Sequence, residues 1–193
     1  QSLSPIVDCG VHYLDVMCQI TRARATRVNA LGARLTDGMP GVVLPKGMYN
    51  YGMLQVAFDD GSVGWYEAGW GPMMSETAFF VKDMIGPKGA VSIAVDEGKT
   101  ESASIDSHTK TSALKIHHAA LDADGRLARR DEILQMDDEP GHQELCDREQ
   151  RAFLKAIRDN EDLTEHARGA IDSLRIALAA DESIRTGRLV ALD

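Results

Sequence analysis

The chain has 193 residues, of which 44% are hydrophobic and 26% are charged, and its formal net charge is −9. These values are typical of a globular protein, and the scattered Lys and Arg residues exclude the clustered basic surface of a nucleic-acid-binding protein. No apolar run approaches the roughly 18–20 residues of a membrane helix, and no signal-peptide pattern opens the chain. We therefore expect neither a nucleic-acid partner nor a membrane partner.

The three cysteines are Cys9, Cys18 and Cys146, and they form no Cys-x-x-Cys motif. A sparse, odd set of cysteines favours a reducing compartment, so we expect a cytoplasmic protein. The first residue is Gln1 rather than Met, and a chemically interesting motif begins only seven residues later. We interpret the chain as part of a longer protein whose N-terminal portion is missing.

The first predicted element is a helix that carries a polar stripe. Ser4 can cap its N-terminus, and Pro5 suits its first position, where no N–H is needed. Asp8, His12 and Asp15 follow at i, i+4 and i+7, which places them within an arc of roughly 60° on a regular helix. A carboxylate one turn from an imidazole can act as an acid/base unit.

Two other interpretations of this stripe stay open at the level of the residues alone. Asp8, His12 and Asp15 can simply form a solvated helix face. The same side chains could bind a divalent metal ion, but such a site needs further ligands. No His or Cys residue is spaced to supply them, so we expect no metal.

Strands dominate the middle of the chain. Alternating apolar residues bounded by Gly, Pro and Asp predict strands and hairpins. The predicted segments are a strand at 24–36, a hairpin at 52–70 with a two-residue turn at Asp60-Gly61, a hairpin at 78–95 with a turn at Gly86–Gly89, and a strand at 111–119. The Gly- and Pro-rich residues 37–50 are expected to form a loop, while the polar residues 96–110 remain ambiguous.

Two helices are predicted to close the chain, over residues 142–159 and 165–186. Thr164 is the expected cap of the second helix and Gly187 its stop. The apolar tail Leu189–Leu192 is expected to dock as an extended piece.

Central strands with helices at both ends predict one α+β domain over residues 1–193. We expect a large, mostly antiparallel open sheet with helices packed on one face. Trp65 and Trp70 would point to opposite faces of a regular strand, so one would be buried and the other could stack on a bound ligand or fill a subunit interface. The adjacent His117 and His118 would likewise face opposite sides and make poor joint ligands.

The motif Asp8-x-Gly10-x-His12-x-x-Asp15 resembles the second catalytic motif of the Gfo/Idh/MocA oxidoreductases. Later segments are also similar to that family in order along the chain. They are the hairpins LQVAFDDGSVGWYEAGW and VKDMIGPKGAVSIAV and the closing segment that runs from EQRAFLKAIRDN to RTGRLVAL.

The resemblance implies the C-terminal domain of such an oxidoreductase. The family's Rossmann domain and its Glu-Lys-Pro-type motif have no counterpart in this sequence, so NAD or NADP would be bound mainly by a missing N-terminal domain. The Gly86–Gly89 spacing lies between strands and does not precede a helix, so it is not a dinucleotide-binding loop. The full-length protein would be an NAD(P)-dependent enzyme that oxidises a CH–OH group of a sugar or polyol, and this chain alone would be inactive.

By the same resemblance, His12 would take the hydroxyl proton and Asp8 would bind a substrate hydroxyl or stabilise the imidazole, while Asp15 would play a supporting part. Two alternatives share this fold: a non-catalytic sugar sensor or scaffold, and an NAD-dependent glycosidase. Both Trp residues and other apolar side chains on the hairpins suggest that the open sheet face needs burial, so we expect a homodimer or tetramer.

Overall fold

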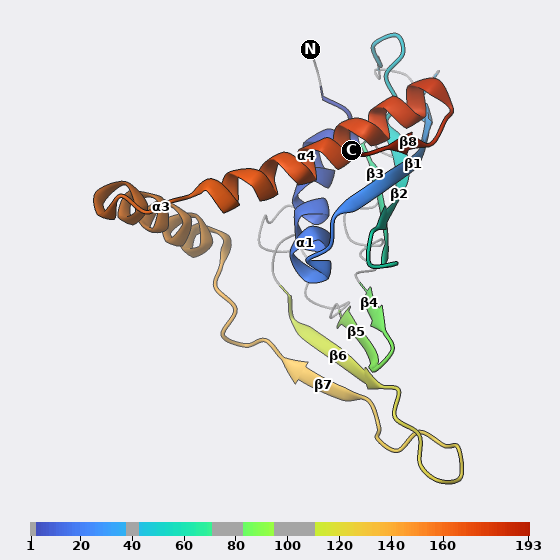
Figure 1. Cartoon of the computed structure of the whole chain (residues 1–193), viewed down its shortest axis with the longest axis vertical. Helices are drawn as coiled ribbons and strands as arrows, with labels where there is room; N and C mark the ends of the chain where they lie inside the picture. The colour runs from blue at the N-terminus through green and yellow to red at the C-terminus, as the bar shows by residue number, and fades with distance from the viewer. Residues whose placement is uncertain (1–2, 38–42, 71–82, 95–110) are drawn as a thin grey trace. The chain divides into compact units, whose positions relative to one another are not determined.

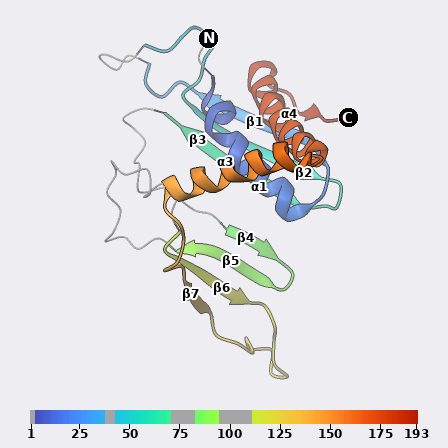
Figure 2. The same ribbon diagram turned by 90° about the vertical axis from the view of Figure 1, so that its left-hand side faces the viewer.

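The structure is a computed structural model that describes residues 3–37, 43–70, 83–94 and 111–193. Its contacts divide the chain into two compact units. The first unit comprises residues 1–74 and 162–193, and the second unit comprises residues 75–161. Figures 1 and 2 show the elements of both units. None of the helices in the described ranges is long and apolar enough to span a membrane.

The first unit is an antiparallel sheet covered on one face by helices. Its elements are η1 (Ile6–Gly10), α1 (Val11–Thr21), β1 (Ala25–Ala33), β2 (Tyr51–Phe58), β3 (Val63–Gly69), α4 (Thr164–Thr186) and β8 (Val190–Ala191). The strand order is β3-β2-β1-β8, and every pairing is antiparallel. The apolar tail therefore docks as an extended piece, as predicted.

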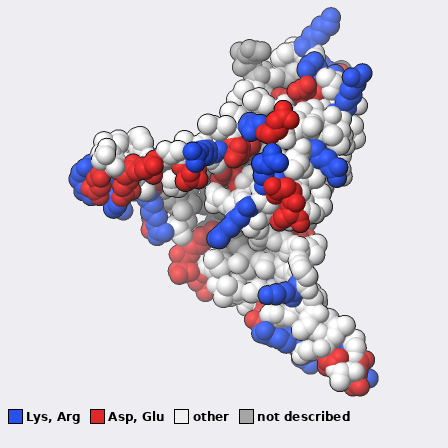
Figure 3. Space-filling model, in the orientation of Figure 1, with Lys and Arg blue, Asp and Glu red and all other residues white. Residues whose placement is uncertain are grey.

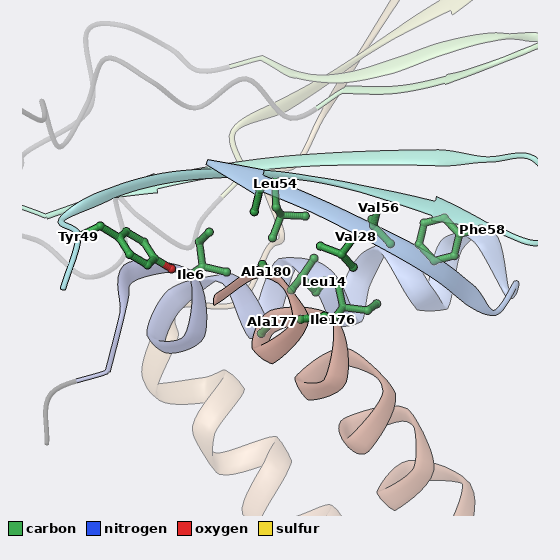
Figure 4. Packing of buried hydrophobic residues seen from close by; sticks show 12 residues of the cluster. Ile6, Leu14, Val28, Tyr49, Leu54, Val56, Phe58, Ile176, Ala177 and Ala180 are labelled. Atoms are coloured by element: carbon green, nitrogen blue, oxygen red, sulfur yellow. The ribbon is translucent and has the colours of Figure 1, made fainter. Parts of the chain in front are cut away.

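The core of this unit lies between the sheet and the two helices α1 and α4 (Figure 4). Alternate strand residues face it, because side chains on a strand point to opposite sides in turn. Helices α1 and α4 contribute the fully buried Leu14 and Ile176 to this core. Strands β1 and β2 contribute the fully buried Val28, Leu54 and Val56. The predicted packing of helices on one face of an antiparallel sheet is confirmed here.

The other face of this sheet carries no helix from the described part of the unit. Leu31 and Trp65 project there and are 64% and 51% exposed, and Val63 is 76% exposed. On the β1–β2–β3 ladder these side chains alternate with the core-facing set, such as Ala30 opposite Leu54. Trp65 is thus the tryptophan that points away from the core.

The β2–β3 hairpin has a longer loop than predicted. The Phe58 N–H donates to the Ser62 carbonyl over 2.9 Å, so three residues, Asp59 to Gly61, form the loop. Gly61 has φ +89°, the left-handed conformation that follows a turn in three-residue hairpin loops. The predicted two-residue turn at Asp60-Gly61 is therefore wrong by one residue, because the left-handed glycine closes the loop rather than occupying the centre of a tighter turn.

The second unit contains a separate antiparallel sheet and one helix. Its elements are β4 (Asp83–Gly86), β5 (Gly89–Ala94), β6 (Ala113–His118), β7 (Glu132–Gln135) and α3 (His142–Asp159), with strand order β4-β5-β6-β7. The strands thus form two four-stranded sheets within the described residues, in place of one continuous large sheet. The expected strand residues 78–82 and the ambiguous residues 96–110 lie outside the described ranges.

The local signals at the helix ends are partly confirmed. Helix α3 has the predicted bounds, and Gly187 ends α4 in the left-handed conformation, with its N–H bonded to the Ser183 carbonyl. The cap of α4 differs from the prediction. The Asp162 carboxylate accepts hydrogen bonds from the N–H and hydroxyl of Thr164, which is the first residue of the helix rather than its cap.

Candidate functional site

The helical segment that carries the motif begins as predicted. It starts at Pro5, directly after Ser4. The Ser4 Oγ accepts a hydrogen bond from the Val7 N–H over 3.2 Å, which satisfies one of the free donors of the first turn. Ser4 therefore acts as the helix cap that its sequence position indicates.

The first turns are not a regular α-helix. Residues Ile6–Gly10 form a π-helical turn, η1, that leads without a break into α1. A π-helix closes hydrogen bonds from i to i+5, so each residue advances by a smaller angle than in an α-helix. On a regular α-helix, the directions of residues 8 and 12 around the helix axis differ by about 40°. Because the π-helical turn advances by a smaller angle per residue, the difference in direction between Asp8 and His12 is smaller than on a regular α-helix.

Gly10 fixes the approach of this turn to the sheet. A Cβ atom added at Gly10 would lie 2.8 Å from Cε1 of Tyr66, a half-buried residue of β3. The Tyr66 ring in turn stacks on the ring of Tyr13, with 5.2 Å between the ring centroids. The absence of a side chain at Gly10 therefore lets the helical turn pack directly on the tyrosine ring.

The two candidate catalytic side chains are accessible. Asp8 and His12 are both exposed, so each can reach a bound molecule. The described residues offer His12 no hydrogen-bond partner, whereas Asp8 accepts a hydrogen bond from the Cys9 thiol over 3.8 Å. An exposed imidazole beside a carboxylate can exchange a proton with a substrate hydroxyl, and this is the chemistry that the pair can perform.

Asp15 has different surroundings. Its carboxylate accepts a hydrogen bond from the Gln19 side chain over 2.5 Å. Asp15 also lines a cleft of about 450 Å³ at the C-terminal end of α1, together with residues of α4 such as Asp172. Asp8 and His12 do not line this cleft. Asp8 and His12 are thus exposed residues outside this cleft, whereas Asp15 lines it and is bonded to Gln19.

Cys9 and Trp70 are neighbours of the site that sequence reasoning did not assign to it. The Cys9 thiol donates to the Asp8 carboxylate over 3.8 Å, and the Trp70 side chain influences the pKa of that thiol. Burial raises the pKa of Cys9, while the Trp70 hydrogen bond lowers it and the Asp8 charge raises it. The raised pKa keeps the thiol protonated, and in this form it can donate to the Asp8 carboxylate.

Asn50 holds the backbone of Trp70 in place. Its carbonyl accepts from the Trp70 N–H over 2.7 Å, and its side-chain amide donates to the Trp70 carbonyl over 3.1 Å. Asn50 is 1% exposed and also bonds Thr36 and the N–H of Leu35. This buried amide therefore joins the end of β3 to the chain that follows β1.

The histidines of the second unit are engaged separately. His117 contacts Asp131 over 2.8 Å, and His118 contacts Glu132 over 2.9 Å. The two imidazoles thus have different carboxylate partners, as expected of neighbours that face opposite sides of a strand. In the described part of the chain, no three His, Cys, Asp or Glu side chains are grouped closely enough to hold a metal ion.

The described residues also do not fit the phosphates of a dinucleotide. Gly86 and Gly89 flank the turn between β4 and β5, and Gly89 has φ +145°. This turn connects two antiparallel strands, whereas a dinucleotide-binding loop leads from a strand into a helix whose N-terminus faces the pyrophosphate.

Basic and acidic side chains are interspersed on the face shown in Figure 3. Arg24 and Asp59 approach to 3.8 Å, and Arg175 and Asp172 to 3.9 Å, as exposed pairs. Pairs of this kind contribute at most about 1 kcal/mol each. They lower each other's charge locally and contribute little to stability.

Comparison with known proteins finds no family model and no curated protein that match this sequence. Solved structures do match it. An oxidoreductase domain protein from Kribbella flavida aligns with 98% of this chain and 50% of its own, with a TM-score of 0.67 and 15% identity. An aldose-aldose oxidoreductase from Caulobacter crescentus, complexed with glycerol, aligns with 97% of this chain and 47% of its own, with a TM-score of 0.63 and 15% identity.

A levoglucosan dehydrogenase in complex with NADH and levoglucosan aligns with 98% of this chain and 50% of its own, with a TM-score of 0.62 and 18% identity. The chain spans about half the length of these solved structures. At such low identities, structural similarity establishes a shared fold, and function has to be argued from the site. The chain therefore has the α+β fold found in about half of each of these oxidoreductases.

Proposed function

We propose that this chain is the substrate-binding and catalytic domain of an NAD(P)-dependent oxidoreductase of the Gfo/Idh/MocA type, acting on a CH–OH group of a sugar or polyol. The observation that carries the proposal is the position of His12. It is exposed, it lies on the same helix as the carboxylate of Asp8, and the fold is one that sugar oxidoreductases share.

His12 would act as the general base. Oxidation of a carbinol requires removal of the hydroxyl proton, and an imidazole titrates near neutral pH, so it can take that proton and return it in the reverse direction. Asp8 would bind a neighbouring hydroxyl or stabilise the imidazolium. Asp15 would support this end of the site only indirectly, since its carboxylate is bonded to Gln19.

The hydride acceptor would come from outside this chain. NAD or NADP would supply it when bound, as NADH is bound in the levoglucosan dehydrogenase complex. The described residues include no glycine-rich turn that leads into a helix, so the proposal places the dinucleotide on a separate domain of a longer protein. Under this proposal the isolated chain, which lacks the domain that binds the dinucleotide, would not oxidise a substrate by itself.

The test uses the full-length protein with NAD and NADP and a panel of sugars and polyols. Replacing His12 by Ala should lower kcat by ~10²–10⁴ while the fold is retained, because a general base typically contributes that factor. His166, an exposed histidine of α4, provides the matched control, and His166→Ala should leave kcat unchanged. Equal rates for wild type and His12→Ala would remove His12 from the mechanism. Release of a free sugar without net cofactor reduction would identify the glycosidase alternative.

We also propose that the open face of the first sheet pairs with a second copy. Leu31, Val63 and Trp65 lie on that face and are each more than half exposed. If the same face of two copies met, the contact would be related by a two-fold axis, which is the usual geometry of a homodimer. Contiguous exposed apolar patches larger than a few hundred Å² are uncommon on monomeric proteins and often mark interaction sites.

A further inference from the structure

The turn that carries Asp8 is fixed at its start by Ser4. The Ser4 carbonyl accepts a hydrogen bond from the Asp8 N–H over 2.9 Å, and the Ser4 Oγ accepts one from the Val7 N–H. The Ser4 hydroxyl in turn donates to the carboxylate of Asp181, a residue of α4, over 2.8 Å. The backbone from which the Asp8 side chain projects is therefore tied to the closing helix through the Asp181 carboxylate.

The Tyr49 side chain holds the same carboxylate from the side of the sheet. Its hydroxyl donates to the Asp181 oxygen that also accepts from Ser4. Burial raises the pKa of Tyr49, and its hydrogen bond to Asp181 raises the pKa further, so the phenol keeps its proton and remains a donor. Figure 4 shows the Tyr49 hydroxyl directed toward Ile6, the first residue of η1.

The core of the first unit holds both the tyrosine ring and the carboxylate in place. A Cβ added at Gly32 would lie 3.0 Å from Cγ of Tyr49, and one added at Gly52 would lie 2.7 Å from its Cε2. These two glycines are paired in the β1–β2 ladder, so the ring lies directly on the backbone of both strands. On α4, the fully buried Ala180 immediately precedes Asp181. The anchor is thus part of the rigid interior of the unit.

We propose that Asp181 is a positioning residue for the reaction: it fixes the turn that Ser4 caps and thereby sets the direction in which Asp8 presents its carboxylate to a molecule at His12. This inference rests on the proposed function and adds a residue that does not touch the substrate. Positive charge develops on the imidazole only as the proton is transferred. A carboxylate that is already oriented stabilises this charge without having to reorganise first.

The conformation of the turn explains why it needs an anchor. π-helical turns are rare, and they occur mostly as single turns, often at functional sites. The turn η1 is held at its start by the bond from Ser4 to α4 and at its end by the contact of Gly10 with the Tyr66 ring. Release of the first contact would let the turn relax toward a regular α-helix, which would change the angle between Asp8 and His12 around the helix axis.

The first experiment measures hydrogen exchange of single amides by NMR in the chain itself. The exchange rate of the Asp8 N–H should rise about tenfold in Asp181→Ala, because its acceptor, Ser4, loses its anchor. The Arg22 N–H bonds the Cys18 carbonyl over 2.9 Å at the other end of α1, so it is the internal control and its rate should not change. Asp181→Asn should restore slow exchange, since its amide oxygen can accept from both hydroxyls. An unchanged rate of the Asp8 N–H in Asp181→Ala overturns the inference.

The second experiment compares the steady-state kinetics of full-length variants. Asp181→Ala should lower kcat about tenfold with little change in KM, because the interaction that it weakens is made only in the transition state. Asp181→Asn should restore most of the lost kcat. Ser183→Ala is the matched control, because the buried hydrogen bond that it removes joins α4 to the Ala30 N–H of β1. Ser183→Ala should therefore leave kcat unchanged.

The outcomes separate this inference from the proposed function. Ser4→Ala removes the same bond from the other partner, so it should lower kcat by a similar factor and keeps the test open when Asp181→Ala does not fold. A normal kcat in either variant overturns the inference, and so does an equal fall of kcat in Ser183→Ala, which would attribute the loss to stability alone. A normal rate in His12→Ala overturns the proposed function instead, while exchange of the Asp8 N–H still reports on the anchor.

Discussion

The Ser4 hydroxyl donates a hydrogen bond of 2.8 Å to the carboxylate of Asp181, a residue of α4 that lies 177 positions further along the chain. The same carboxylate oxygen accepts a hydrogen bond from the Tyr49 hydroxyl. Ser4 is 6% and Tyr49 7% exposed. This small polar cluster therefore joins the turn that carries the site to the start of β2 and to the closing helix.

Removing the Ser4 hydroxyl should destabilise the first unit. Ser4→Ala loses both the helix cap and the bond to Asp181, and we expect the free energy of unfolding to fall by about 1–2 kcal/mol. Urea unfolding followed by circular dichroism measures the change. Ser4→Asn keeps a capping side chain and should recover part of the loss. Equal stability of wild type and Ser4→Ala would show that the cluster contributes nothing.

Gly10 should not tolerate a side chain. A Cβ at this position would meet the Tyr66 ring at 2.8 Å, so Gly10→Ala should cost about 1–3 kcal/mol through overpacking. Gly169 is the matched control, because it lies inside α4 and, apart from its chain neighbours and the nearby backbone of its own helix, no atom lies within 4 Å of the point that its Cβ would occupy. Gly169→Ala should stabilise the protein by about 0.5–1 kcal/mol through helix propensity. Both are measured by urea unfolding, and a Gly10→Ala variant as stable as wild type would contradict the packing.

Alkaline pH should unfold the first unit through two of its four tyrosines. Burial raises the pKa of Tyr49, assisted by its hydrogen bond to Asp181, and burial raises the pKa of Tyr66. Because the pKa in the folded state exceeds the unfolded value of about 10, the stabilisation is complete below that pH and declines as the pH rises above it.

Absorbance of the phenolate form against pH tests this expectation, with near-ultraviolet circular dichroism to report the fold. We expect part of the absorbance change to appear only together with unfolding. That part should decrease in Tyr49→Phe and Tyr66→Phe. Complete ionisation of all four tyrosines near pH 10 in a protein that stays folded would be the opposite result.

The chain should self-associate through the open sheet face. We expect light scattering at micromolar concentration to give a dimer or a larger assembly, and Leu31→Glu should weaken it by placing a charge on the face. Ile20, which is 51% exposed on α1, serves as the control, and Ile20→Glu should leave the assembly intact. A monomeric wild-type chain would remove the proposed interface.

The sequence predicted those elements whose patterns involve only residues close to one another in the chain. Alternation identified β1 and the β2–β3 hairpin, Ser4 and Pro5 marked the start of the first helix, and Gly187 marked the end of the last. Strand β7 was not predicted, because its four residues, Glu132–Gln135, contain two polar and two apolar side chains without alternation. It is a strand because it pairs with β6.

The geometry of the site depends on contacts between distant residues, so the sequence could not predict it. The π-helical turn lies where Gly10 rests on Tyr66, a residue of another element. The position of the Trp70 backbone depends on Asn50, which lies 20 positions earlier and bonds the Trp70 N–H and carbonyl. The spacing of Asp8, His12 and Asp15 was interpreted on a regular helix, whereas Asp8 lies in the π-helical turn and the other two lie in α1.

The pairing of β8 with β1 has a consequence for the order in which the chain can fold. The first unit consists of residues 1–74 and 162–193. The core beside the N-terminal strands is therefore complete only when the last 32 residues, which include β8, are present. The Ala30 N–H, for example, bonds the Ser183 hydroxyl, 153 positions away. During synthesis, which proceeds from the N-terminus, β4 to β7 emerge while Val28 and Leu54 still lack the helix that covers them, so the core of the first unit closes only after the last helix has been made.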